Sequence, residues 1–162
     1  MKVTVNILRH GIAEDASKET SDADRALTAA GKRKLAAVLK RARVAGVAPQ
    51  LILTSSLVRA MQTAHIAGAA LGVDEAIRQT DKLLPNASPA DTWSELRSLA
   101  SQGELLVVGH EPHLSRLAVF LLGAPGLRLD LKKGGLIRIR IENAGPKPHG
   151  ILEWILTPRL AK

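Results

Sequence analysis

Two arginines and two histidines follow predicted strands, and together they suit phosphoryl chemistry. Arg9 and His10 follow one apolar run, Arg59 comes shortly after a second, and His110 follows a third. A guanidinium can meet two phosphate oxygens at once through charge-assisted hydrogen bonds. A histidine can attack phosphorus and carry the phosphoryl group covalently. The four residues therefore predict a phosphate-binding site with a histidine nucleophile.

Each of these residues also has an ordinary explanation when it is taken alone. A histidine can simply end a strand, and an arginine can be a solvated residue of a first helical turn. Their shared placement after strands favours a common site, in which Arg9, Arg59 and a protonated His110 would neutralise the phosphoryl oxygens. Neither paired carboxylates nor a His-x-x-x-His spacing is present, so we expect no metal and no cofactor. We expect the remaining three histidines to be structural or superficial: His65, His113 and His149.

The elements that must position the site follow from the hydrophobic pattern. Alternating or continuous apolar runs predict strands at 3–8, 51–53, 76–79, 105–108, 136–141 and 151–156. Helical spacing and capping residues predict helices that begin at Thr28, at Ser55 or Ser56, at Pro89 and at Pro112. This order predicts an α/β fold: a three-layer α/β/α sandwich with a mostly parallel sheet and a C-terminal antiparallel hairpin. Ligands of such sheets bind beyond the carboxyl ends of the strands.

The last two strands carry a further expectation about the sheet. Ile137, Ile139 and Ile141 alternate with charged residues. Such alternation predicts a sheet face that is open to water on one side.

Length and composition limit the number of domains and the classes of protein to consider. A chain of 162 residues suits a single domain over residues 1–162. The absence of cysteine excludes disulfide frameworks, thiolate zinc sites and cysteine nucleophiles. The run at 117–122 is too short to span a membrane, and the N-terminus lacks a secretory pattern, so we expect a cytoplasmic protein without membrane contact. The net charge of +8 suits nucleic acid, an acidic partner or a phosphorylated substrate.

Three motifs in order resemble the histidine phosphatase superfamily, also called phosphoglycerate-mutase-like. They read LRHG at 8–11, TSSLVRAMQTA at 54–64 and VVGH at 107–110. The segment RALT at 25–28, followed by Gly31, resembles the small bacterial phosphohistidine phosphatase branch. The similarity extends over nearly the whole chain.

The resemblance implies a role for each matching residue. His10 would be the nucleophile, and Arg9 and Arg59 would hold the phosphoryl oxygens. His110 would complete the pocket and stabilise charge. Gly11 would let the backbone turn tightly after His10, and its carbonyl would fix the tautomer of the ring. Arg25 would lie on a loop that lines the entrance.

One departure concerns the general acid. Larger members carry a glutamate before the third motif, but the corresponding region here reads DKLLPNAS at 81–88. Either one of Glu14, Asp15, Asp22 and Asp24 replaces it, or the substrate needs no strong acid. Phosphohistidine meets the second condition, because its leaving nitrogen can be protonated before departure. The short chain also leaves little room for the cap of larger members, which favours an open site that admits a side chain of another protein.

Three hypotheses follow. The first is a metal-independent phosphatase that acts through a phosphohistidine intermediate on phosphohistidine in a partner, such as a phosphotransfer protein. The second is a phosphatase of small esters, such as sugar or nucleotide phosphates. The third, which the motifs disfavour, is a non-catalytic nucleic-acid-binding module that uses basic residues at 32–43 and 132–140.

Overall fold

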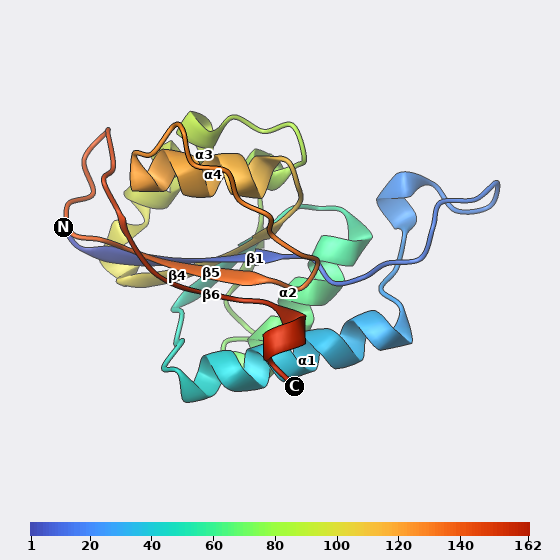
Figure 1. The fold of residues 1–162 in the computed structure, drawn as a ribbon. Helices are drawn as coiled ribbons and strands as arrows, with labels where there is room; N and C mark the ends of the chain where they lie inside the picture. Colours follow the sequence, from blue (N-terminus) through green and yellow to red (C-terminus); the bar gives the residue numbers. More distant parts are fainter.

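A six-stranded mixed sheet forms the centre of the protein in the computed structural model, which describes residues 1–162 (Figure 1). The strands lie in the order β3-β2-β4-β1-β5-β6. Neighbours among the first four strands in this order are parallel, whereas β5 and β6 are antiparallel. The strands are β1 (Val3–Arg9), β2 (Leu51–Thr54), β3 (Ile77–Gln79), β4 (Glu104–Gly109), β5 (Leu136–Ile141) and β6 (Ile151–Leu156).

Two pairs of helices cover opposite faces of the sheet, with α1 and α2 on one side and α3 and α4 on the other (Figure 1). The helices are α1 (Ala29–Val44), α2 (Val58–Leu71), α3 (Pro89–Ser98) and α4 (His113–Leu122). Short 3-10 turns lie at η1 (Asp22–Asp24), η2 (Asp81–Leu83), η3 (Ala100–Gln102) and η4 (Pro158–Leu160). The predicted three-layer sandwich with its antiparallel hairpin is confirmed. None of the helices is both long and apolar enough to cross a membrane.

Each face of the sheet contributes alternate residues to a separate core. On one face, Leu8, Ile52 and Val108 pack with the buried sides of α1 and α2. On the other face, Ile7 and Val107 pack with the buried sides of α3 and α4. The strands in the middle are therefore buried on both faces, as their continuous apolar sequences predict.

The second helix begins later than its sequence suggests. Neither Ser55 nor Ser56 is its N-cap; Leu57 occupies that position and makes no side-chain capping bond. The hydroxyl of Ser55 lies 2.6 Å from Nε2 of His110. The serine thus contributes to the site at the sheet edge, whereas Thr28 and Ser88 cap α1 and α3 as predicted.

The polar face of the last strands is partly open to water, as the sequence predicts, but its charges are paired with one another. The side chain of Arg138 is only 15% exposed, and its Nη1 lies 2.7 Å from Glu104 Oε1 and 3.1 Å from Asn6 Oδ1. Its Nε donates to Glu153, which also accepts from Arg140. The Asn6 amide on β1 and the charged side chains of β4, β5 and β6 therefore form a cross-strand network on this partly exposed face.

The start of α1 packs directly on the segment that leaves β1. A methyl group on Gly31 would collide with the backbone of Ile12, two residues after His10. The Gly31 amide also donates to the capping hydroxyl of Thr28 at 2.8 Å. Only glycine therefore lets the helix approach this closely without moving the backbone beside the site.

We expect Gly31→Ala to destabilise the fold by about 1–3 kcal/mol, because neither backbone can yield without losing its hydrogen bonds. The matched control is Gly126→Ala, where nothing lies within 4 Å of the added methyl group. Urea unfolding monitored by circular dichroism measures both. Equal stability of the two variants would contradict the close contact.

Candidate active site

The pairing of the strands brings the ends of β1, β2 and β4 to one point on the sheet edge. Arg9 lies opposite Gly109 in the parallel register, and the His10 amide donates to the Gly109 carbonyl at 3.1 Å. The Ser55 amide donates to Val108 on the other side of β4, at 3.2 Å. The rings of His10 and His110 consequently lie 5.1 Å apart between centroids, at an angle of 50°.

His10 is held as a neutral ring with a defined tautomer. Its Nδ1 lies 2.7 Å from the Gly11 carbonyl, which can only accept, so Nδ1 carries the proton and the lone pair is on Nε2. Burial lowers the pKa of His10 to about 4, and nearby Arg59, Arg9 and Lys133 also disfavour the cation. The Gly11 carbonyl works in the opposite direction but does not outweigh these effects. At neutral pH, Nε2 is therefore able to act as a nucleophile.

Gly11 is fixed by contacts rather than by an unusual backbone conformation. It is not among the glycines with positive φ. Its amide donates to Thr63 Oγ1 at 3.1 Å, and that hydroxyl donates to the Arg59 carbonyl at 2.7 Å. A methyl group at this position would lie 3.3 Å from Leu27. The segment after β1 is thereby attached to α2, which carries Arg59.

Arg9 and Arg59 each use one part of the guanidinium to anchor it and keep another part unbonded. Nη1 of Arg9 donates to the Leu131 carbonyl at 2.9 Å, and Nη1 of Arg59 donates to the Asp22 carbonyl at 2.9 Å. The Nε atoms of both arginines are buried without a protein partner. Buried donors without a protein partner are rare in native structures, and a bound ion or water is one group that supplies the acceptor.

His110 is neutral in the free protein, whereas the protonated ring that the sequence predicts belongs to the phosphate-bound site. It is 1% exposed, and burial beside His10 and Arg59 lowers its pKa to about 3. Its Nε2 contacts the Ser55 hydroxyl, whereas Nδ1 is buried without a partner. A bound dianion would add negative charge beside the ring and so favour its protonation.

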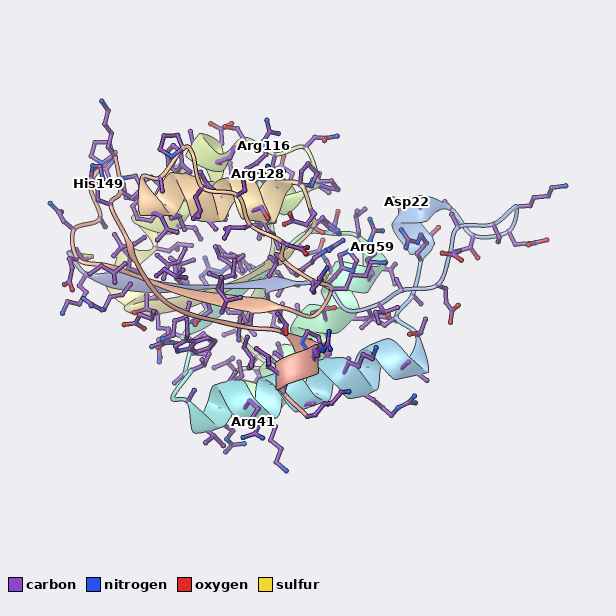
Figure 2. All side chains as sticks on the ribbon, in the orientation of Figure 1. Asp22, Arg41, Arg59, Arg116, Arg128 and His149 are labelled. Carbon is purple, nitrogen blue, oxygen red and sulfur yellow. The ribbon has the colours of Figure 1, made fainter.

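Asp22 and Arg25 connect the loop after β1 to the site. Asp22 lies on η1 close to Arg59, as Figure 2 shows, and its Oδ2 is 3.4 Å from Arg59 Nη2. Arg25 donates from Nη1 to Asp22 at 3.0 Å and from Nε to the Glu14 carbonyl at 2.6 Å. Arg25 therefore holds this loop and Asp22, and through them Arg59.

Among the carboxyl groups that the sequence offers as a general acid, Asp22 is the one that contacts the site. Of the four acidic residues proposed as substitutes for a general acid, Asp22 contacts a phosphate-binding candidate. The Arg25 hydrogen bond, aided by Arg59, holds the pKa of Asp22 below its usual value. Asp22 is therefore ionised at neutral pH and is poorly suited to donate a proton in this state.

Several contributors to the site were not identified as such from the sequence. Ser55 positions His110, and Asp22 anchors Arg59. The segment before β5 supplies the Leu131 carbonyl to Arg9, and its Gly134 amide donates to the His10 carbonyl at 3.0 Å. Contributions from backbone groups cannot be identified from the types of side chain in the sequence. Ser55, however, belongs to the second motif and stands four residues before Arg59, and this position within the motif could have identified it.

The other histidines lie outside this cluster. His113 is buried, and its Nε2 lies 3.0 Å from Thr92 Oγ1. His65 and His149 are exposed. The structure contains no group of three or more His, Cys, Asp or Glu side chains arranged to hold a metal ion.

The family model of the histidine phosphatase superfamily (branch 1) matches residues 5–84. An uncharacterized protein of Picosynechococcus is 38% identical over 145 residues, which cover 87% of each chain. The chain belongs to the histidine phosphatase superfamily.

Solved structures place this histidine phosphatase in the small SixA-like branch. The protein histidine phosphatase SixA in complex with tungstate shares the fold, with a TM-score of 0.86, 23% identity and coverage of 99% of this chain and 100% of that one. A protein of Agrobacterium tumefaciens that is assigned as phosphohistidine phosphatase SixA has a TM-score of 0.77 and 25% identity. The match covers 96% of this chain and 98% of that one.

The lowered pKa values predict that this histidine phosphatase loses stability in acid. Between pH 6.5 and the folded pKa of His110, about 3, the unfolded chain binds a proton at this position that the folded chain does not. Unfolding free energy therefore falls as the pH falls. We expect wild type to lose about 2–3 kcal/mol more than His110→Gln between pH 7 and pH 4.5.

Urea unfolding at both pH values measures this difference. His65→Gln, on the exposed side of α2, is the matched control and should follow wild type. If wild type and His110→Gln lose the same unfolding free energy between pH 7 and pH 4.5, burial does not hold this ring neutral.

Proposed function

We propose that the protein is a metal-independent phosphatase whose His10 becomes transiently phosphorylated, and that its substrate is phosphohistidine on a partner protein. The observation that carries the proposal is the fixed, neutral His10 beside two arginines with unbonded Nε atoms. Membership of the superfamily and the assignment of the Agrobacterium structure support it. The proposed setting is the cytoplasm.

In the first step, the lone pair on Nε2 of His10 attacks phosphorus. A bond forms between Nε2 and phosphorus while the bond from phosphorus to the substrate imidazole breaks. The electron pair stays on the departing nitrogen, and because the other nitrogen of the substrate ring is protonated beforehand, the leaving group is neutral imidazole. Arg9 and Arg59 spread positive charge over the phosphoryl oxygens, which is the main demand of phosphoryl transfer. The hydrogen bond from Nδ1 to Gly11 stabilises the positive charge that His10 acquires.

In the second step, water attacks phosphorus and returns the electron pair to Nε2. Inorganic phosphate leaves, and His10 regains its neutral form. We assign to His110 a supporting role in both steps. The Ser55 hydroxyl donates to Nε2 of His110, so that Nδ1 carries a proton and donates it to a phosphoryl oxygen as a hydrogen bond. Ser55 is then a positioning residue.

The character of the leaving group favours phosphohistidine. An alkoxide needs a proton as it departs, and general acid catalysis contributes about 10²- to 10⁴-fold to such steps. Asp22, the carboxyl group that contacts Arg59, is held ionised by two arginines. A phosphohistidine ring takes a proton from solvent on its distal nitrogen before the bond breaks, so that the imidazole departs neutral without such help.

Small phosphate esters are the second candidate. The observation in their favour is the position of Asp22 beside Arg59, because the negative charge of a bound phosphoryl group would raise the pKa of this carboxyl group and favour its protonated form. An acid of this kind is what ester substrates require.

Substrate comparison tests the proposal. We expect kcat/KM for a histidine-phosphorylated protein to exceed that for phosphoserine, a sugar phosphate and a nucleoside monophosphate by about 10²-fold or more. His10→Ala should abolish phosphate release, and His65→Ala should leave it unchanged. Esters that are hydrolysed as efficiently as the phosphoprotein would favour the second candidate.

A further inference from the structure

An apolar groove with a basic rim extends along α4, outside the phosphoryl site. It has a volume of about 810 Å³ and lies between α4, the segment that follows it and the loop between β5 and β6. Val119, Phe120 and Leu127 belong to its apolar lining. The cationic side chains around it are Arg116, Arg128 and Lys147, with His149 at one end, and no acidic residue lines it.

The exposed side of α4 has the residue spacing of a helix-packing surface. Arg116, Val119, Phe120 and Gly123 stand at i, i+3, i+4 and i+7, on the groove. The buried side of the same helix uses a different set, which includes Leu117 and Leu121. The groove side therefore presents two apolar residues, Val119 and Phe120, and Phe120 also packs partly against the core. Seven residues of α4 extend over about 10 Å, enough for about two turns of a bound helix.

The charges around the groove are free to act on a partner. None of the ion pairs or side-chain hydrogen bonds in the protein uses Arg116, Arg128 or Lys147. Figure 2 shows Arg116 and Arg128 over the same part of α4, with His149 toward the opposite end. An acidic partner is the one that such a rim attracts and orients.

Two chain segments link the groove to the phosphoryl site. Ser115 lines the groove, and its hydroxyl donates at 2.5 Å to Glu111, the residue after His110. The segment from Leu127 to Leu129 also lines it, and two residues later the Leu131 carbonyl accepts from Arg9. A protein that lies in the groove therefore contacts segments that also hold groups of the site.

We propose that this groove binds an acidic amphipathic helix of the phosphorylated partner protein. The helix places apolar residues against Val119, Phe120 and Leu127, and its carboxylates face Arg116 and Arg128. This mode of recognition is common where one apolar helix face meets a groove. The proposal rests on the proposed function, because the bound partner is taken to carry the phosphohistidine that His10 attacks.

A labelled peptide tests the groove independently of catalysis. The probe is a fluorescent helical peptide of about four turns, with leucine at i, i+3, i+4 and i+7 and glutamate elsewhere. A scrambled peptide of the same composition is its control. We expect anisotropy to show salt-dependent binding of the amphipathic peptide alone, weakened about tenfold by Arg116→Glu with Arg128→Glu.

Matched variants test whether the peptide binds in the groove or elsewhere on the surface. Lys34→Glu with Lys40→Glu makes the same change of charge on the exposed side of α1 and should alter peptide binding less than about twofold. Leu127→Asp, at a side chain that is 40% exposed, should weaken binding without loss of folding. Equal binding by wild type and both groove variants would overturn the docking proposal. Binding of phosphatidylglycerol vesicles in place of the peptide would do the same.

The catalytic consequence separates this proposal from the proposed function. The double groove variant should raise KM for a histidine-phosphorylated protein by about tenfold and leave turnover of free phosphohistidine unchanged. An unchanged KM for the phosphoprotein would refute docking while the phosphatase assignment stands. Failure of wild type to hydrolyse either substrate would refute the phosphatase assignment, whereas peptide binding would still report on the groove.

Discussion

The site depends on the parallel register between β1 and β4. Because Arg9 lies opposite Gly109, the residues that follow the two strands, His10 and His110, emerge side by side. A shift by one residue would turn the core side chains of β1 toward the opposite face and separate the two rings. The apolar faces that stabilise the sandwich therefore also determine the geometry of the site, so that the two cannot vary independently.

The register places His10 in a buried position, where the charged form of the ring is disfavoured and the neutral form can act as a nucleophile. Removal from water and proximity to arginines disfavour its charged form, while the Gly11 carbonyl specifies which nitrogen holds the proton. The same cations that keep the ring neutral would stabilise a phosphoryl group after it arrives. Unbonded Nε atoms on Arg9 and Arg59 are consistent with this exchange, since an anion would supply their missing acceptors. The unpaired Nε atoms lower the stability of the free protein, but they leave the site ready to bind an anion.

Much of the fold was predictable, since continuous apolar strands and capped helices leave few alternative arrangements. The gathering of Arg9, His10, Arg59 and His110 also followed from their places after strands. The sequence did not reveal what long-range contacts decide. The charges of β5 lie on a partly exposed face, but their pairing with Glu104 and Glu153 depends on residues of other strands. The burial that keeps His110 neutral in the free protein likewise depends on neighbours that the local sequence does not show.

The central claim is that Nε2 of His10 receives the phosphoryl group. The direct measurement is phosphorus NMR of the enzyme, quenched with alkali during turnover of a phosphohistidine protein and then assigned through couplings to the ring protons. The account predicts one phosphorylated histidine, His10, modified at Nε2, because Nδ1 is engaged with Gly11. Phosphate release without an enzyme-bound phosphoryl group, or modification of another residue or of Nδ1, would contradict it.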